Sequence, residues 1–231
     1  MAAAADLKFA MDELVSEFQT AHPGTEVAVT YGSSGSFFAQ LEQRAPFDLF
    51  FSADIHYPKT LARAGHSLDE VFLYAVGRIV LWAPKSSKLD VAKLGIAVLD
   101  GPAIKKIAVA NPDHAPYGRA AVAALKTLGL YEKVRSKLVF GENIAQTAQF
   151  IQSGAADIGV IALSLAVAPQ LSEAGDWWEI PFDAYPKMEQ GGMITKWTMN
   201  AETARALRDH LLGTHGREVL KRHGFFLPGQ N

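Results

Sequence analysis

The chain has no cysteine among its 231 residues. It therefore forms no disulfide and offers no thiol nucleophile, thiolate metal ligand or cysteine for lipid attachment. It also has no large net charge: the sequence contains 22 basic and 24 acidic residues, which gives a formal net charge of −2. Without a basic run the sequence carries no electrostatic footprint for nucleic acid or an acidic membrane, and we expect neither as a partner.

Long apolar runs and metal-ligand patterns are missing as well. No run approaches the roughly 18 apolar residues that span a bilayer, so we expect no membrane insertion. The seven histidines are scattered, without an i, i+4 pair or an acidic residue at ligand spacing. They are His22, His56, His66, His114, His210, His215 and His223. We therefore expect no site for a metal cation.

Signals of catalysis are weak. A serine hydrolase would centre its nucleophile in Gly-x-Ser-x-Gly, whereas residues 32–36 read GSSGS. His114 could act as a base, but nothing in the sequence pairs it with a serine. Asp48 and Asp54 flank an apolar stretch, where a turn residue and a helix cap are favoured over a Mg²⁺ or catalytic pair. We expect no enzyme and no cofactor, with a serine-dependent hydrolase as a less favoured alternative.

The patterns that are present predict an α/β protein. With 49% hydrophobic residues the chain can bury a large core, in one domain or in two lobes of about 100 residues. Apolar periodicity predicts strands over residues 27–31, 49–52, 79–83, 107–110, 138–140 and 158–162. It predicts helices over 7–18, 36–43, 56–64, 117–128, 144–153, 200–212 and 216–223. This alternation favours doubly wound sheets. Trp177 and Trp178 fit a partly buried strand better than a cation-binding aromatic box.

Residues 31–41 (YGSSGSFFAQL) predict an anion site between a strand and a helix. Gly32 and Gly35 let a ligand approach the backbone, and serine hydroxyls can donate beside the N–H groups of a helix start. The partial positive charge of a helix N-terminus can hold an oxyanion without lysine or arginine. Taken alone, this stretch is more typical of ordinary N-capping by Ser34 or Ser36.

The same pattern of strand end, small residues and helix start recurs along the chain. It is found over residues 4–7, 114–118 and 141–144. Ligands of open α/β sheets lie beyond the carboxyl ends of strands, where all four loops are expected. Four helix starts could therefore converge on one small ligand.

Several segments together resemble the molybdate-binding proteins of bacterial ABC importers, and the resemblance covers nearly the whole chain. The segments are AAADL (3–7), YGSSG (31–35), APFDLFFSAD (45–54), NPDHAPYG (111–118), GAADIG (154–159) and Gly224-Phe225. The resemblance implies a two-lobed type II periplasmic binding fold, each lobe a doubly wound mixed sheet flanked by helices, with the ligand in the interlobe cleft. Lobe I would comprise residues 1–79 and 193–231, and lobe II residues 80–192, with crossings near 77–80 and 189–193.

The resemblance also implies a function and a set of contacts. The expected function is a receptor for a tetrahedral oxyanion, molybdate or tungstate, which delivers it to a membrane permease. The implied contacts are Ala5, Asp6, Ser34, Tyr117 and Ile144, mostly through backbone N–H groups. Ala162 stands where some members place a tyrosine hydroxyl. We further expect a monomer located in the periplasm, with the export signal absent from this sequence.

Asp6 departs from the family, which commonly has Ser or Asn at this position. A carboxylate facing a dianion is repelled at low effective dielectric. The favoured interpretation is that Asp6 caps its own helix while its backbone N–H reaches the ligand. The alternative is that Asp6 accepts a hydrogen bond from a protonated oxyanion such as hydrogen phosphate or arsenate.

Overall fold

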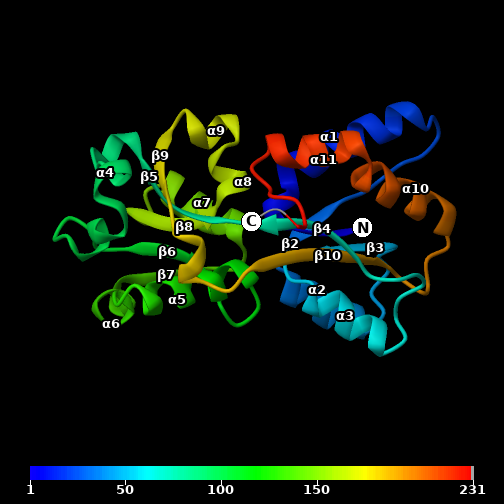
Figure 1. The fold of residues 1–231 in the computed structure, drawn as a ribbon, viewed down its shortest axis with the longest axis horizontal. Coiled ribbons are helices and arrows are strands. Elements are labelled where there is room, and N and C mark those ends of the chain that lie inside the picture. Colours follow the sequence, from blue (N-terminus) through cyan, green and yellow to red (C-terminus); the bar gives the residue numbers. More distant parts are fainter. Residues whose placement is uncertain (230–231) are drawn as a thin grey trace. The chain divides into compact units, whose positions relative to one another are not determined.

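The computed structural model describes residues 1–229 and divides the chain into two compact units (Figure 1). Unit 1 comprises Met1–Val76 and the chain from Glu189 onward, and unit 2 comprises Gly77–Met188. The expected crossing ranges, 77–80 and 189–193, begin at these boundaries, whereas the expected lobe bounds of 79 and 193 lie three and four residues later. Periodicity could not locate them, because strands run through both crossings: Phe72–Gly77 is followed at once by Ile79–Pro84, and Met188–Ile194 spans the return.

Unit 1 is built on a five-stranded mixed sheet in the order β2-β1-β3-β10-β4. Its strands are β1 (Ala2–Ala4), β2 (Thr30–Gly32), β3 (Leu49–Ser52), β4 (Phe72–Gly77) and β10 (Met188–Ile194). Its helices are the 3₁₀ turn η1 (Ala5–Leu7), α1 (Lys8–Ala21), α2 (Ser34–Glu42), α3 (His56–Arg63), α10 (Ala201–Leu212) and α11 (Thr214–Arg222). β1 runs parallel to β2 and β3, while β10 is antiparallel to β3.

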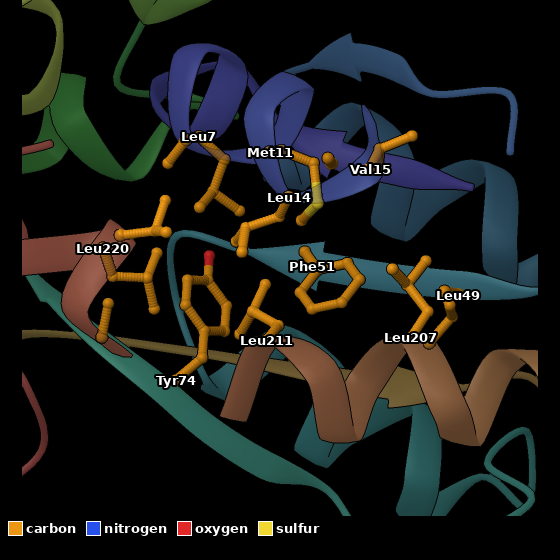
Figure 2. Close-up of a cluster of buried hydrophobic side chains, with 14 of the residues drawn as sticks. Leu7, Met11, Leu14, Val15, Leu49, Phe51, Tyr74, Leu207, Leu211 and Leu220 are labelled. Atoms are coloured by element: carbon orange, nitrogen blue, oxygen red, sulfur yellow. The ribbon is translucent and has the colours of Figure 1, made fainter. Parts of the chain in front are cut away.

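Helices cover both faces of this sheet (Figure 1). On one face Met11 and Leu14 of α1 point toward Phe51 and Tyr74 of the sheet, with Leu211 of α10 closing the cluster (Figure 2). On the other face α2 and α3 bury a second cluster, formed by Ala2, Phe37, Leu41, Phe50, Leu61 and Met193. Burial of two apolar faces explains why β1 and β3 read as continuous apolar runs rather than alternating ones.

Unit 2 repeats the architecture with the strand order β7-β6-β8-β5-β9. Its strands are β5 (Ile79–Pro84), β6 (Ile107–Ala110), β7 (Leu138–Gly141), β8 (Ile158–Ala162) and β9 (Gly175–Glu179). Its helices are α4 (Val91–Leu94), α5 (Pro116–Thr127), α6 (Tyr131–Val134), α7 (Ile144–Gln152), α8 (Leu163–Ala166) and α9 (Pro169–Ser172). Short 3₁₀ turns occupy Lys85–Ser87, Gly95–Asp100, Arg135–Lys137 and Phe182–Ala184. β6 is parallel to β7 and β8, and β5 is antiparallel to β8 and β9.

The expected fold class is confirmed, and the errors have local causes. Trp177 and Trp178 lie in strand β9, as expected. The strand expected over 27–31 exists but begins three residues later than expected, since β2 is Thr30–Gly32. The Val27 N–H is instead held by the side-chain oxygen of Gln19 at 2.7 Å. Periodicity also missed β4, whose first two residues are partly exposed or exposed, and β10, whose paired glycines hide the strand pattern.

An ion pair joins the loop before β4 to α10 and gives a pH-dependent prediction. Asp69 accepts two hydrogen bonds from Arg205, both of 2.8 Å, and one of 3.3 Å from Arg208. The hydrogen bond from Arg205 holds the pKa of Asp69 below its usual value. A lowered folded-state pKa stabilises the protein above the ordinary carboxyl range, and this contribution is lost as pH falls through the lowered pKa.

Replacement Asp69→Asn should therefore lower the free energy of unfolding at pH 7. The difference from the wild type should shrink as the pH falls from about 5 toward 3. Urea unfolding across that range measures it. Glu70→Gln removes the neighbouring carboxylate and serves as the matched control. A difference that grows toward low pH would contradict the assignment.

Candidate functional site

In unit 1, two helix starts lie side by side because two parallel strands end together. The register pairs Ala4 of β1 with Gly32 of β2, and η1 and α2 begin within two residues of that pair. Three expected contacts thus come from neighbouring strand ends, and all are buried: Ala5 is 3% exposed, Asp6 1% and Ser34 1%. The geometry brings together the unit 1 part of the set predicted from the sequence.

The cap of α2 is Ser33, so the interpretation that Ser34 or Ser36 caps this helix is wrong. The Ser33 hydroxyl oxygen accepts from the Ser36 N–H at 3.3 Å, and the Ser33 hydroxyl donates to Ser36 Oγ at 2.8 Å. Ser34 is the first residue of the helix. Its hydroxyl is therefore not used in capping.

The Ser34 hydroxyl is oriented by the end of the next strand. Its oxygen accepts a 2.9 Å hydrogen bond from the N–H of Ala53, which directly follows β3. A hydroxyl has one proton to donate and two lone pairs. Because the Ala53 N–H occupies one lone pair of Ser34 Oγ, the hydroxyl proton points in another direction. Among residues 1–229 this proton has no acceptor. Ser34 is thus a buried, fixed donor.

The structure corrects the expectation for the Asp6 side chain. The N-cap of η1 is Ala4, which has no side chain able to cap, and Asp6 lies within the turn. The Asp6 carboxylate accepts a 2.7 Å hydrogen bond from the amide of Gln190 on β10, a residue with no exposed surface. Burial, together with the charge of Asp6, raises the pKa of Tyr74 well above its usual value. Tyr74 therefore stays neutral and donates to the carbonyl of Ser52 at 3.0 Å.

In unit 2, the same arrangement recurs at the ends of β6 and β7. The register pairs Ala110 with Gly141, and α5 and α7 begin shortly after these two residues. Tyr117 is 3% exposed and Ile144 is 4% exposed. The unit 2 part of the expected set therefore also comes from the ends of two neighbouring parallel strands.

The first turns of α5 and α7 direct particular N–H groups out of the helix. In α7, the Asn143 side chain accepts from the N–H groups of Ala145 and Gln146, each at 3.0 Å. The N–H of Ile144 remains, and no described residue accepts from it. In α5, Pro116 has no N–H, and the Ala115 carbonyl takes those of Gly118 and Arg119. The Ala115 carbonyl does not accept from the N–H of Tyr117, and Tyr117 has a partner of its own.

The groups weighed for catalysis have structural partners. His114 Nε2 lies 2.9 Å from the carbonyl oxygen of Glu142 and so bridges the loops before α5 and α7. Asp54 accepts from the His56 N–H at 2.9 Å, but the N-cap of α3 is Ile55, so the expectation that Asp54 caps this helix is wrong. Asp48 accepts from the Thr198 hydroxyl at 2.6 Å. None of these contacts pairs a nucleophile with a base.

Two searches of the described chain have negative results. Within residues 1–229, no group of three or more His, Cys, Asp or Glu side chains is placed to hold a metal ion. Over the same residues, every helix is too short or too polar to cross a bilayer.

Sequence reasoning missed Gln190, the partner of Asp6. Gln190 is a polar residue within a strand whose residues are nearly all buried. A polar side chain in such a strand indicates a buried hydrogen-bond partner. The strand itself was not predicted, so the signal could not be read.

Comparisons with known proteins agree with this geometry. The family model for the bacterial extracellular solute-binding proteins matches residues 1–226. The molybdate-binding protein ModA of Azotobacter vinelandii is 37% identical over 228 residues, which cover 98% of this chain and 89% of that protein. ModA of Rhodobacter capsulatus is 33% identical over 207 residues, covering 89% and 79%.

Solved structures extend the likeness. The periplasmic molybdate-binding protein of Azotobacter vinelandii superposes with a TM-score of 0.91 at 31% identity, covering 98% of both chains. The sulfate-binding protein SubI of Mycobacterium tuberculosis gives 0.79 at 13% identity, covering 99% of this chain and 86% of that one, which shows the fold alone.

Proposed function

The chain belongs to the bacterial extracellular solute-binding proteins and is a receptor rather than an enzyme, and from that premise we propose that it captures molybdate for an ABC importer. Tungstate, a tetrahedral dianion of the same charge, belongs to the same proposal. A periplasmic location is supported by the name of the Azotobacter structure. A membrane permease is the partner that this role requires, and we propose that the receptor acts as a monomer.

The observation that carries the proposal is the fixed hydroxyl of Ser34. It is 1% exposed, held by the Ala53 N–H and left with a proton to donate. Buried donors are normally satisfied within the protein. The Ser34 hydroxyl is held in place while its proton has no acceptor among the described residues. Such a preoriented donor is what an anion-binding site requires before the anion binds.

We propose that Ala5, Asp6, Ser34, Tyr117 and Ile144 bind one anion. All five lie in the first turn of a helix that follows a parallel strand. Each helix start adds about half a positive charge, and each N–H adds directional donation, so the dianion is neutralised without lysine or arginine. Ala162 is the last residue of β8 and has no hydroxyl, so Tyr117 and Ile144 are the proposed donors of unit 2.

Selectivity follows from the number and spacing of such donors. Molybdate and tungstate are larger than sulfate, so a shell of donors fixed for them leaves some donors too far from sulfate. Each buried donor left without a partner costs about 1 to 3 kcal/mol. Sulfate should therefore bind at least tenfold more weakly than molybdate.

Calorimetric titration of the ligand-free protein tests the proposed function. Molybdate, tungstate, sulfate and phosphate are compared in one neutral buffer other than phosphate. We expect tight, equimolar binding of molybdate and tungstate, with sulfate much weaker. Tight sulfate binding with molybdate silent would contradict the proposed ligand, and silence of all four anions would contradict the oxyanion receptor.

A further inference from the structure

The loops before α5 and α7 are bridged by the side chain of His114. This residue lies between β6 and α5, three residues before Tyr117, while Glu142 lies between β7 and α7, two residues before Ile144. His114 Nε2 lies 2.9 Å from the carbonyl oxygen of Glu142 and 3.2 Å from its carboxylate oxygen Oε1. The imidazole thus joins the two segments of unit 2 that carry proposed anion contacts.

The direction of this hydrogen bond follows from the chemistry of its partner. A backbone carbonyl oxygen has no proton and only accepts, and the same holds for an ionised carboxylate. The proton must therefore be on His114 Nε2, which donates toward Glu142. The imidazole is 23% exposed, so much of the bond is shielded from competing water.

The bridge lies beyond the point where the two strands stop pairing. The β6–β7 register ends with Ala110 opposite Gly141, and the N–H of Asn111 still donates to the Gly141 carbonyl at 2.8 Å. Past these residues the chains turn into separate helices, so the strand ladder no longer sets their separation. The contact between His114 and Glu142 crosses this gap.

Each of the two loops also has hydrogen bonds of its own. The Asn111 carbonyl accepts from the Ala115 N–H at 2.8 Å, and the Glu142 N–H donates to the side-chain oxygen of Gln146 at 2.7 Å. These bonds hold the shape of each helix start separately. Loss of the His114 bridge should therefore change the separation of the two starts more than the shape of either one.

We propose that His114 is a positioning residue of the anion site, which sets the separation of the α5 and α7 starts and thereby the preference for molybdate over sulfate. This inference rests on the proposed function, in which Tyr117 and Ile144 contact the anion. Hydrogen bonds to oxygen are effective only over a few tenths of an ångström. A separation fixed for molybdate keeps the donors too far from the smaller sulfate, whereas a loosened separation lets them approach it.

Two variants of His114 test the bridge, with molybdate and sulfate titrated separately by calorimetry. His114→Ala removes the donor, and we expect the affinity for molybdate to fall about tenfold, as for the loss of one hydrogen bond. The affinity for sulfate should fall by less than about threefold, so that the ratio of the two affinities decreases. His114→Gln can donate to the Glu142 carbonyl from its amide nitrogen, and should keep both affinities within about twofold of the wild type.

His22→Ala is the matched control because it removes a bond of the same kind. His22 Nδ1 lies 2.9 Å from the carbonyl oxygen of Phe18, at the end of α1 in unit 1. This contact lies at one helix end and joins no two loops, so we expect both affinities to stay at the wild-type values. Urea unfolding of every variant shows how much stability each one loses.

The ratio of the two affinities decides the outcome. If His114→Ala keeps the wild-type ratio, whether both affinities fall or neither does, the positioning role is overturned and the receptor is left intact. A ratio that falls in His114→Ala and is not restored in His114→Gln also overturns it. His114→Asn has an amide one carbon shorter and should lower the ratio as alanine does, so the test holds even where the alanine variant does not fold. Failure of the wild type to bind any oxyanion overturns the proposed function itself.

Discussion

Replacing Ser34 with alanine is expected to weaken molybdate binding by about 10- to 150-fold. The figure corresponds to about 1.5 to 3 kcal/mol, the usual contribution of a hydrogen bond to a charged acceptor. The hydroxyl is already oriented by the Ala53 N–H, so the free protein spends no entropy on ordering it when the anion binds. Calorimetric titration of Ser34→Ala against the wild type, at one pH and one salt concentration, measures the loss.

Two variants separate affinity from folding in this experiment. Ser33→Ala removes the cap of α2 and should cost about 1 kcal/mol of stability, so it shows how far a less stable α2 alone weakens binding. Ser16→Ala removes an exposed hydroxyl from α1 and should change neither quantity. Affinity of Ser34→Ala equal to that of the wild type would remove Ser34 from the site.

The elements that position the site could be predicted because their signals are local. The strands Leu49–Ser52, Ile107–Ala110 and Ile158–Ala162 were located to the residue, since each is a short apolar run bounded by turn residues. The helix starts at α5 and α7 were located within one residue, because Pro116 and Asn143 are strong start signals. Short-range sequence signals therefore suffice to locate the strand ends and the helix starts that follow them.

The contacts inside the site could not be predicted because they join distant parts of the chain. Gln190 and Asp6 are 184 residues apart in the sequence. Apolar periodicity does not predict that β10 pairs with β3, which is what brings Gln190 into the sheet of unit 1. The Ala53 N–H reaches Ser34 across 19 residues and depends on the order of β1, β2 and β3 in the sheet. Ser33 rather than Ser34 became the cap because helix α2 begins one residue after it. In a serine-rich loop, composition does not fix which serine that is.

The Asp6 departure shows what sequence and structure each contribute. The sequence alone identified a carboxylate where an anion is expected, and left helix capping and ligand contact as alternatives. The structure replaces capping with a hydrogen bond from Gln190, a partner on another strand. Both side chains are buried, so a strand of the sheet, rather than the start of its own helix, orients the Asp6 carboxylate.

Gly118→Ala is expected to lower the free energy of unfolding by about 3 kcal/mol, at the upper end for overpacking. A Cβ at position 118 would lie 2.1 Å from the carbonyl oxygen of Ala110 and 2.8 Å from the nitrogen of Pro112. Both atoms belong to the backbone at the end of β6 and cannot move as a flexible side chain would. The first turn of α5 must therefore shift outward, which carries the N–H of Tyr117 with it. We expect molybdate affinity to fall at least tenfold, because donors to a small anion act only at short range. Urea unfolding and calorimetric titration measure the two effects.

A less crowded glycine distinguishes this packing effect from a general cost of adding a methyl group. Gly213 precedes α11 at a φ of −65°, and a Cβ there would meet the Asp209 carbonyl only at 3.2 Å. Gly213→Ala should therefore change stability by less than about 1 kcal/mol and leave affinity unchanged. If Gly118→Ala binds molybdate as tightly as the wild type while losing stability, then the Tyr117 N–H is not a ligand contact, and unit 2 must hold the anion through α7 alone. If Gly118→Ala loses neither stability nor affinity, the close packing of α5 on the end of β6 is wrong.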